Sequence, residues 1–416
     1  MKKLILSSVF AGLVLASGVE AAAPQQAAYG KFVINADFAA GLWANVYHQS
    51  PGNAEGDTID KDDITKRMLI ALPETKLTVK SEGGCSCVAF GTVVRLEVDG
   101  SRFKDQPKAG ESLFRDTYVY ARFNNVGEIR IGSQRDATYS LVGPDSLMGG
   151  TYGYNGYYGN LLKSTSVFGV SRKDRFVLGL SHANDTWYSN AVEFRSVRMS
   201  GVQVVANWKP SSAYIGRLGT YGDGARTNGA QNNLVSLGIN YDNTFGDFRA
   251  RVSAGGVYGI SDRTDAVGVK IADQATSLTY RIGSAFSWKS LDFGVGWWDN
   301  LHTGFAGANK DRNAGRAIHG VVGYQFDTTM WKPRLSLGAL WGWKNGNRKE
   351  EAALNFSKED QTVAVSFAAD MNIREGFRWF VEGTLAMLDD RNTVGTADKG
   401  FDDINVIVGT GLAVSQ

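Results

Sequence analysis

Hydrophobic and polar residues alternate strictly along most of this chain, in short runs separated by polar segments. In the first run Phe32, Ile34 and Ala36 share one parity, while Asn35 and Asp37 hold the other. Side chains alternate between the two faces of a β-strand, so such a run has one apolar face and one polar face. On a helix the same apolar positions would scatter around the surface. The pattern therefore predicts strands.

Sixteen such windows can be counted, and they reach the C-terminal end of the chain. They begin near residues 30, 75, 88, 114, 127, 190, 202, 233, 247, 276, 291, 316, 331, 361, 377 and 403. Short turns such as Asn124–Gly127 alternate with long polar segments such as 210–232. An even number of antiparallel strands, with short turns at one rim and long loops at the other, is typical of outer-membrane barrels. We predict an all-β fold, a closed 16-stranded antiparallel transmembrane β-barrel over residues 22–416.

A soluble β-sandwich also alternates, so two further features are needed to favour the barrel. The polar parity carries arginine in run after run, among them Arg95 and Arg130, with Glu128 nearby to balance the charge. Such a face is stable only when it is wet, and a closed sheet leaves no backbone group unpaired in lipid. Aromatic residues such as Trp208 and Trp341 stand near the ends of the apolar runs, as in the aromatic girdles of membrane barrels.

Composition and charge exclude other classes. The 44 basic residues nearly balance the 42 acidic ones, which does not suggest nucleic-acid binding. After the N-terminus the chain has no apolar run of about 20 residues, so a bundle of membrane helices is excluded.

The N-terminal segment predicts export. Basic Lys2 and Lys3 precede an apolar stretch over residues 4–16 and small residues at 21–23. This order is typical of a secretory signal peptide, and we expect residues 1–21 to be removed after Ala21. A retained membrane anchor is the alternative, but the apolar stretch is short for one.

The chain has two cysteines, Cys85 and Cys87, which follow Gly83 and Gly84. Export permits a disulfide, but closing so small a ring is strained. The pair is also two ligands short of a closed zinc site. We expect a tight turn.

Nothing in the sequence proposes catalysis, a metal or a cofactor. The four histidines, at positions 48, 182, 302 and 319, lack the spacing of metal ligands. An outer-membrane esterase or phospholipase would need a base beside its nucleophile, and no motif supplies one. We therefore expect a protein that is not an enzyme.

The longest interruption of the strand pattern covers residues 135–189. It contains Asp136, Asp145 and a segment dense in tyrosine and glycine over residues 149–159. Long loops in compact folds are usually functional or disordered, and a barrel of this size would enclose a wide aqueous channel. Folded inward, this third long loop would narrow the channel, and its acids would face bases on the wall across a small gap. The alternative is a solvated extracellular flap.

At this point the chain resembles the general Gram-negative porins. The segments that carry the resemblance are Thr117–Phe123, Gly127–Gln134, Asn190–Ser196 and Gly201–Trp208. The resemblance implies a homotrimer of barrels that lets small hydrophilic solutes and ions diffuse passively across the outer membrane. It also implies contact with outer-membrane lipid and lipopolysaccharide, and insertion by the barrel-assembly machinery.

The resemblance assigns candidate residues to the constriction. Arg130 and Arg195 correspond to wall bases, and Asp136 and Asp145 to loop acids. The inward parity adds three further wall residues: Lys80, Arg95 and Glu193.

Two departures from the family are visible. The chain ends on Val414-Ser415-Gln416 rather than on an aromatic residue. The loop has Gly143-Pro144-Asp145 where the family has a stretch like proline–glutamate–phenylalanine.

Three interpretations of the function stay open. The first is an unselective diffusion channel, with a mild preference for anions because the predicted inward positions carry more basic than acidic residues. The second is a substrate-specific channel, although the inward aromatic residues Trp43, Tyr47 and Phe380 are few and dispersed in the sequence. The third is a non-conducting surface or structural barrel.

Overall fold

A computed structural model describes the strands of the chain and the turns that join many of them. The described residues are 31–49, 68–85, 87–98, 114–141, 143–148, 166–167, 170–171, 189–211, 232–260, 276–303, 315–327, 331–344, 360–389 and 403–415.

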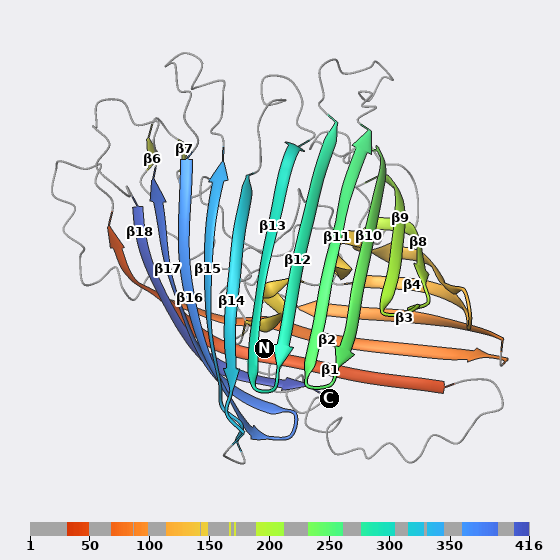
Figure 1. Cartoon of the computed structure of the whole chain (residues 1–416), viewed down its shortest axis with the longest axis horizontal. Helices are drawn as coiled ribbons and strands as arrows, with labels where there is room; N and C mark the ends of the chain where they lie inside the picture. The colour runs from red at the N-terminus through yellow and green to blue at the C-terminus, as the bar shows by residue number, and fades with distance from the viewer. Residues whose placement is uncertain are drawn as a thin grey trace, which may run out of the picture.

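Almost all of these residues belong to one antiparallel sheet (Figure 1). Its strands are β1 (Lys31–Gln49), β2 (Met68–Gly84), β3 (Val88–Val98), β4 (Phe114–Phe123), β5 (Gly127–Gln134), β8 (Ser189–Ser196), β9 (Val202–Ser211), β10 (Asn232–Phe245), β11 (Phe248–Ile260), β12 (Ser277–Trp288), β13 (Leu291–Thr303), β14 (Arg316–Gln325), β15 (Arg334–Lys344), β16 (Asp360–Arg374), β17 (Phe377–Asp389) and β18 (Asp403–Ser415). Each strand pairs with its neighbours in chain order, and β1 pairs with both β2 and β18, so the sheet closes into a barrel.

Two kinds of short element are described between β5 and β8. They are the 3-10 helices η2 (Ala137–Ser140) and η3 (Pro144–Leu147) and a two-stranded hairpin of β6 (Ser166–Val167) and β7 (Val170–Ser171). Within the described residues no helix is long and apolar enough to cross a membrane.

The prediction of an all-β antiparallel fold is confirmed. Most strands begin within one residue of the position at which their alternating window begins. Two strands differ. β2 begins at Met68 instead of near residue 75, and β15 begins at Arg334 instead of near residue 331.

Proline explains both differences. The pairing of β1 with β2 shifts register between Ala39 and Gly41, and Pro73 lies in the corresponding irregular stretch of β2. Because proline has no N–H to donate, a bulge is where a strand tolerates it; alternation breaks there although the strand continues. Before β15, Pro333 follows Lys332, whose φ of 41° places it in a turn.

The two faces of the sheet match the predicted parities. The outward face is apolar: Val119, Ile131 and Leu337 are 53%, 54% and 57% exposed, while their inward neighbours Tyr120 and Ser336 are buried. The outward aromatic residues include Trp208, Tyr258, Trp288, Tyr324, Trp331 and Trp341. An apolar outer face with aromatic residues near its margins is the surface that a lipid bilayer solvates.

The described turns between strands lie at one rim of the barrel. The turns β4–β5, β10–β11, β12–β13 and β16–β17 consist of two or three residues each, and the two at the front are visible at the lower ends of β10–β13 in Figure 1. Gly246 and Gly376 have φ of 60° and 72°, a left-handed conformation that glycine adopts without steric cost. In outer-membrane barrels the rim with short turns faces the periplasm.

Inside the barrel, a buried tryptophan spans the seam where the first and last strands meet. The Trp43 indole lies over Gly409, where a Cβ atom would come within 2.0 Å of its ring. Its Nε1 donates to Oε1 of Glu382 at 2.6 Å, and its ring centroid is 6.0 Å from that of Phe380. Two inward aromatic residues that are far apart in sequence, Trp43 and Phe380, therefore pack together across β1, β18 and β17.

The outward-pointing side chain of Leu337 provides a test of which face of the sheet contacts lipid. Replacing Leu337 with arginine is expected to destabilise the barrel by about 2–4 kcal/mol, because a cation near the middle of the lipid face must leave water. Urea titration of folding into lipid vesicles measures the loss. Leu337→Ala is the control for lost packing, and equal losses in both variants would contradict a lipid-facing position.

The buried indole gives a second test. Trp43→Ala is expected to cost about 3–5 kcal/mol, the range for deleting a large buried aromatic side chain. The matched control is Trp341→Ala on the outer face, where no interior cavity is created and a smaller loss is expected. The same vesicle titration compares them, and a loss at position 341 as large as at position 43 would contradict the role of the seam.

Candidate functional site

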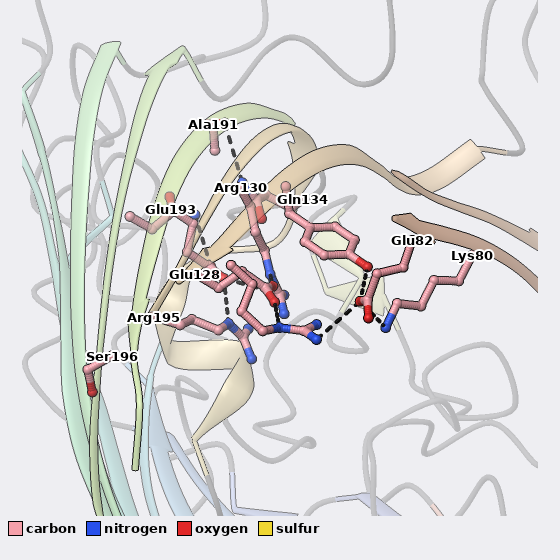
Figure 2. Close-up of polar contacts among 12 residues, drawn as sticks. Lys80, Glu82, Glu128, Arg130, Gln134, Ala191, Glu193, Arg195 and Ser196 are labelled. Carbon is pink, nitrogen blue, oxygen red and sulfur yellow. Dashed lines mark hydrogen bonds and ion pairs between the residues drawn. The ribbon is translucent and has the colours of Figure 1, made fainter. Parts of the chain in front are cut away.

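Charged side chains line the inner face of one section of the barrel, from β2 to β8. Along these strands the inward parity carries seven residues that we call the charged ladder: Lys80, Glu82, Arg122, Glu128, Arg130, Glu193 and Arg195. Figure 2 labels all of them except Arg122, and it shows their side chains extending toward one another. On β4, β5 and β8 they meet because paired strands place residues of the same parity side by side on one face. Between β2 and β4 lies β3, where Gly91 leaves room for Tyr120 to reach across.

The first part of the charged ladder is centred on Glu82. Its Oε2 lies 3.2 Å from Nζ of Lys80 and 3.1 Å from Nη1 of Arg122. The hydroxyl of Tyr120 donates to the same oxygen. Both cations also lie over the Tyr120 ring, at 5.5 Å and 5.3 Å from its centroid. Glu82 and Tyr120 thus hold two bases in fixed positions.

The second part alternates carboxylates and guanidinium groups. Glu128 accepts from Nε of Arg122 at 2.8 Å and from Nε of Arg130. Glu193 lies 3.5 Å from Nη1 of Arg130 and accepts from Nε of Arg195 at 2.6 Å. Each of these carboxylates therefore bridges two arginines, and such charge-assisted hydrogen bonds are stronger than neutral ones.

A separate ion pair lies beside the charged ladder. Arg95 on β3 forms a salt bridge with Asp116 on β4, and its Nε donates to Oγ1 of Thr78 at 3.4 Å.

The acids of the second part lie behind the bases. The Glu128 side chain is 9% exposed and that of Arg122 is 39% exposed; for Glu193 and Arg195 the values are 2% and 26%. The part of each ion pair that reaches the interior of the barrel is therefore the guanidinium group.

The segment after β5 turns into the barrel and lies first against the inner face of β10 and β11. The backbone N–H of Ala137 donates to Oγ of Ser236 at 2.9 Å. Leu141 fills the space over Gly238 and Gly255, where a Cβ atom would come within 2.8 Å and 2.7 Å of its methyl carbons. These contacts fix η2 on the inner face of β10 and β11.

Farther along, η3 lies against β12, β13 and β14. Leu147 is buried in an apolar cluster with Ala285, Trp298, Ala317, Val321, Leu340 and Ala364. Nη2 of Arg334 donates to the carbonyl oxygen of Leu147 and lies 2.8 Å from Oδ2 of Asp292. Residues 135–141 and 143–148 thus lie along the interior, from the end of β5 toward β14.

The sequence matches a family model described as Gram-negative porin over residues 9–393. The chain belongs to the Gram-negative porin family. It is accordingly a β-barrel channel of the outer membrane. The porin's sequence matches no curated protein.

Solved structures share the fold at low sequence identity. One is OmpT, an outer membrane protein of Vibrio cholerae in its trimer form, with 13% identity and a TM-score of 0.53. Another is the anion-selective porin from Comamonas acidovorans, with 12% identity and a TM-score of 0.53. Each comparison covers 93% of this chain and 100% of the solved chain.

The structure brings together most of the residues predicted for the wall. Lys80, Arg130, Glu193 and Arg195 belong to the charged ladder, and Arg95 lies beside it. Their role in a constriction stays a prediction.

The two predicted loop acids follow β5, and their place in a constriction stays a prediction. Oδ1 of Asp136 accepts from the backbone N–H of Thr138 at 2.8 Å and from the Thr138 hydroxyl, so this buried carboxylate caps η2. Asp145 belongs to η3, and its side chain lies outside the described part of the porin.

Sequence reasoning missed several members of the site. Arg122 and Glu82 share the predicted parity, and Arg122 pairs directly with Glu128 across the β4–β5 turn; opposite charges on either side of a short turn were the available signal. Lys209 on β9 is almost fully buried, in electrostatic range of Asp136 and Glu193. No local signal distinguishes it from a lysine at the end of a strand.

Glu128 tests how strongly the charged ladder is coupled. Glu128→Gln is expected to destabilise the porin by about 1–3 kcal/mol, because one of the two guanidinium groups then faces an amide N–H instead of an acceptor and both lose the neighbouring negative charge. Unfolding in urea, followed by tryptophan fluorescence, measures the loss.

The matched control is Asp242→Asn, which removes the partner of the more exposed Arg249 near the turn-side end of β11. An exposed pair contributes about 0–1 kcal/mol, so the control is expected to lose less. Equal losses would show that the charged ladder is no more coupled than a surface ion pair.

Proposed function

We propose that this porin forms a water-filled channel through which small hydrophilic solutes and ions diffuse passively, with a mild preference for anions. The observation that carries the proposal is the charged ladder, in which the acids of the second part lie behind the bases. The ladder contains four bases and three carboxylates. Such a wall is stable only beside water, and it presents positive charge to permeating ions.

We further propose that the whole chain folds as a 16-stranded barrel after removal of residues 1–21, and that residues 135–189 narrow the channel as an inward loop. The inward course of residues 135–148 supports this reading, because η2 and η3 contact the inner faces of β10–β14. In this proposal Lys80, Arg95, Arg130 and Arg195 line one side of the constriction with Glu193 behind them. Asp136 and Asp145 contribute the acidic charge of the loop.

The solved relatives supply two suggestions about assembly and selectivity. The Vibrio cholerae protein was solved in a trimer form, and the Comamonas acidovorans porin is anion-selective. We propose a homotrimer of the present chain with the same direction of selectivity. The alternatives to this diffusion channel are a substrate-specific channel and a non-conducting barrel.

Recording from planar bilayers tests the proposal. Purified protein is expected to insert with stepwise currents of uniform size, and high voltage is expected to close each inserted unit in three equal steps. In a potassium chloride gradient the reversal potential is expected to report anion preference. Electrically silent insertion would support a non-conducting barrel, and cation preference would contradict the charge assignment.

Substitution of the wall then locates the selectivity. The double variant Arg130→Gln and Arg195→Gln is expected to lower the ratio of chloride to potassium permeability several-fold, since it removes two guanidinium groups from the lumen. The charge-matched control replaces Arg249 and Arg378 with glutamine, outside the proposed constriction. An equal change in both double variants would show that selectivity follows total charge rather than the charged ladder.

A further inference from the structure

The β2–β3 turn holds the two thiols of the porin against each other. Sγ of Cys85 and Sγ of Cys87 are 2.8 Å apart, and both side chains are free and exposed. At this distance one thiol donates a hydrogen bond to the other sulfur. The turn belongs to the rim that faces the periplasm in outer-membrane barrels.

The backbone around the thiols is fixed. The N–H of Cys85 donates to the carbonyl oxygen of Val88 at 2.9 Å. In the β4–β5 turn, the N–H of Asn124 donates to the carbonyl oxygen of Cys87 at 3.3 Å. Gly84 has a φ of 146°, and a Cβ atom there would lie 2.2 Å from the Val88 oxygen. Only glycine fits at this position, so the backbone of β2 comes close to that of Val88 at the start of the turn.

The pair is chemically asymmetric. The hydrogen bond from Cys87, together with backbone amides of the turn, lowers the pKa of the Cys85 thiol to about 7. The same contact raises the pKa of Cys87. The thiolate is the reactive form of cysteine, and a thiol with a pKa near the ambient pH attacks disulfides most effectively.

A structural disulfide would contribute little here. The stabilisation from a disulfide grows with the length of the loop that it closes, and this pair is separated by one residue. The hydrogen bonds of the β2–β3 ladder already join the two strands. The strained small ring would also make the bond easier to reduce.

We propose that Cys85 and Cys87 form a thiol–disulfide exchange site at the periplasmic rim, with a low-molecular-weight disulfide as the oxidant. The Cys85 thiolate attacks one sulfur of the oxidant, whose S–S bond breaks and releases one thiolate. The Cys87 thiolate then attacks Sγ of Cys85 and releases the second. The two thiol protons pass to the released thiolates, so two cysteines are oxidised as one disulfide is reduced to two thiols.

Mass spectrometry of the full chain, reduced and folded in detergent, tests the site with oxidised glutathione at pH 7. The unchanged porin is expected to lose two hydrogens without accumulating a glutathione adduct. Cys87→Ser keeps a hydrogen-bond donor beside Cys85 but removes the resolving thiol, so it is expected to accumulate one adduct. Cys85→Ser is expected to react roughly five- to tenfold more slowly, because an ordinary thiol is mostly protonated at this pH.

Two results would overturn the proposal. One is equal adduct formation by the two single variants, and the other is a persistent adduct on the unchanged porin. The shift in gel mobility between heated and unheated samples confirms that each variant is folded. Because the assay does not involve conductance, a silent bilayer recording would leave its outcome unaffected.

Discussion

A backbone N–H or C=O group without a hydrogen-bond partner costs several kilocalories per mole in hydrocarbon, and a sheet meets this constraint only by closing. The pairing of β1 with β18 provides that closure here. Once the sheet is closed, every residue lies either inside or outside, and alternation along each strand separates lipid from lumen. The apolar outer face and the charged inner wall are two consequences of the same closure.

The lumen then allows an arrangement that a dry core would not. Burying a charge without compensation is costly, but a charge that borders water and binds its neighbour is stable. In the charged ladder, Glu128 and Glu193 provide the neighbours and the arginines keep contact with water. The carboxylates order the guanidinium groups and lie behind them, so a wall with nearly balanced charge presents mainly its positive groups.

The inner face is not uniformly polar, and its apolar part packs against η2 and η3. Small residues such as Ala285, Ala317 and Ala364 leave room for Leu147, while Gly238 and Gly255 leave room for Leu141. The charged ladder thus occupies the wall from β2 to β8, while η2 and η3 lie on β10–β14 among small residues and further ion pairs, such as Arg334 with Asp292. The small residues of β10–β14 thus leave room for the chain after β5 to lie along the inner wall.

Alternation alone determined the all-β class, the orientation of each strand and most strand boundaries, because a period of two is a local property of the chain. It failed at Pro73 and Pro333, where a bulge and a turn interrupt the period. Tertiary structure decided which inward residues meet. Trp43 and Glu382 are 339 positions apart and touch only because the barrel closes between them. The contact of Arg130 with Glu193 likewise depends on the pairing of β5 with β8, whereas the cap of Asp136 on Thr138 is a local contact between residues two positions apart.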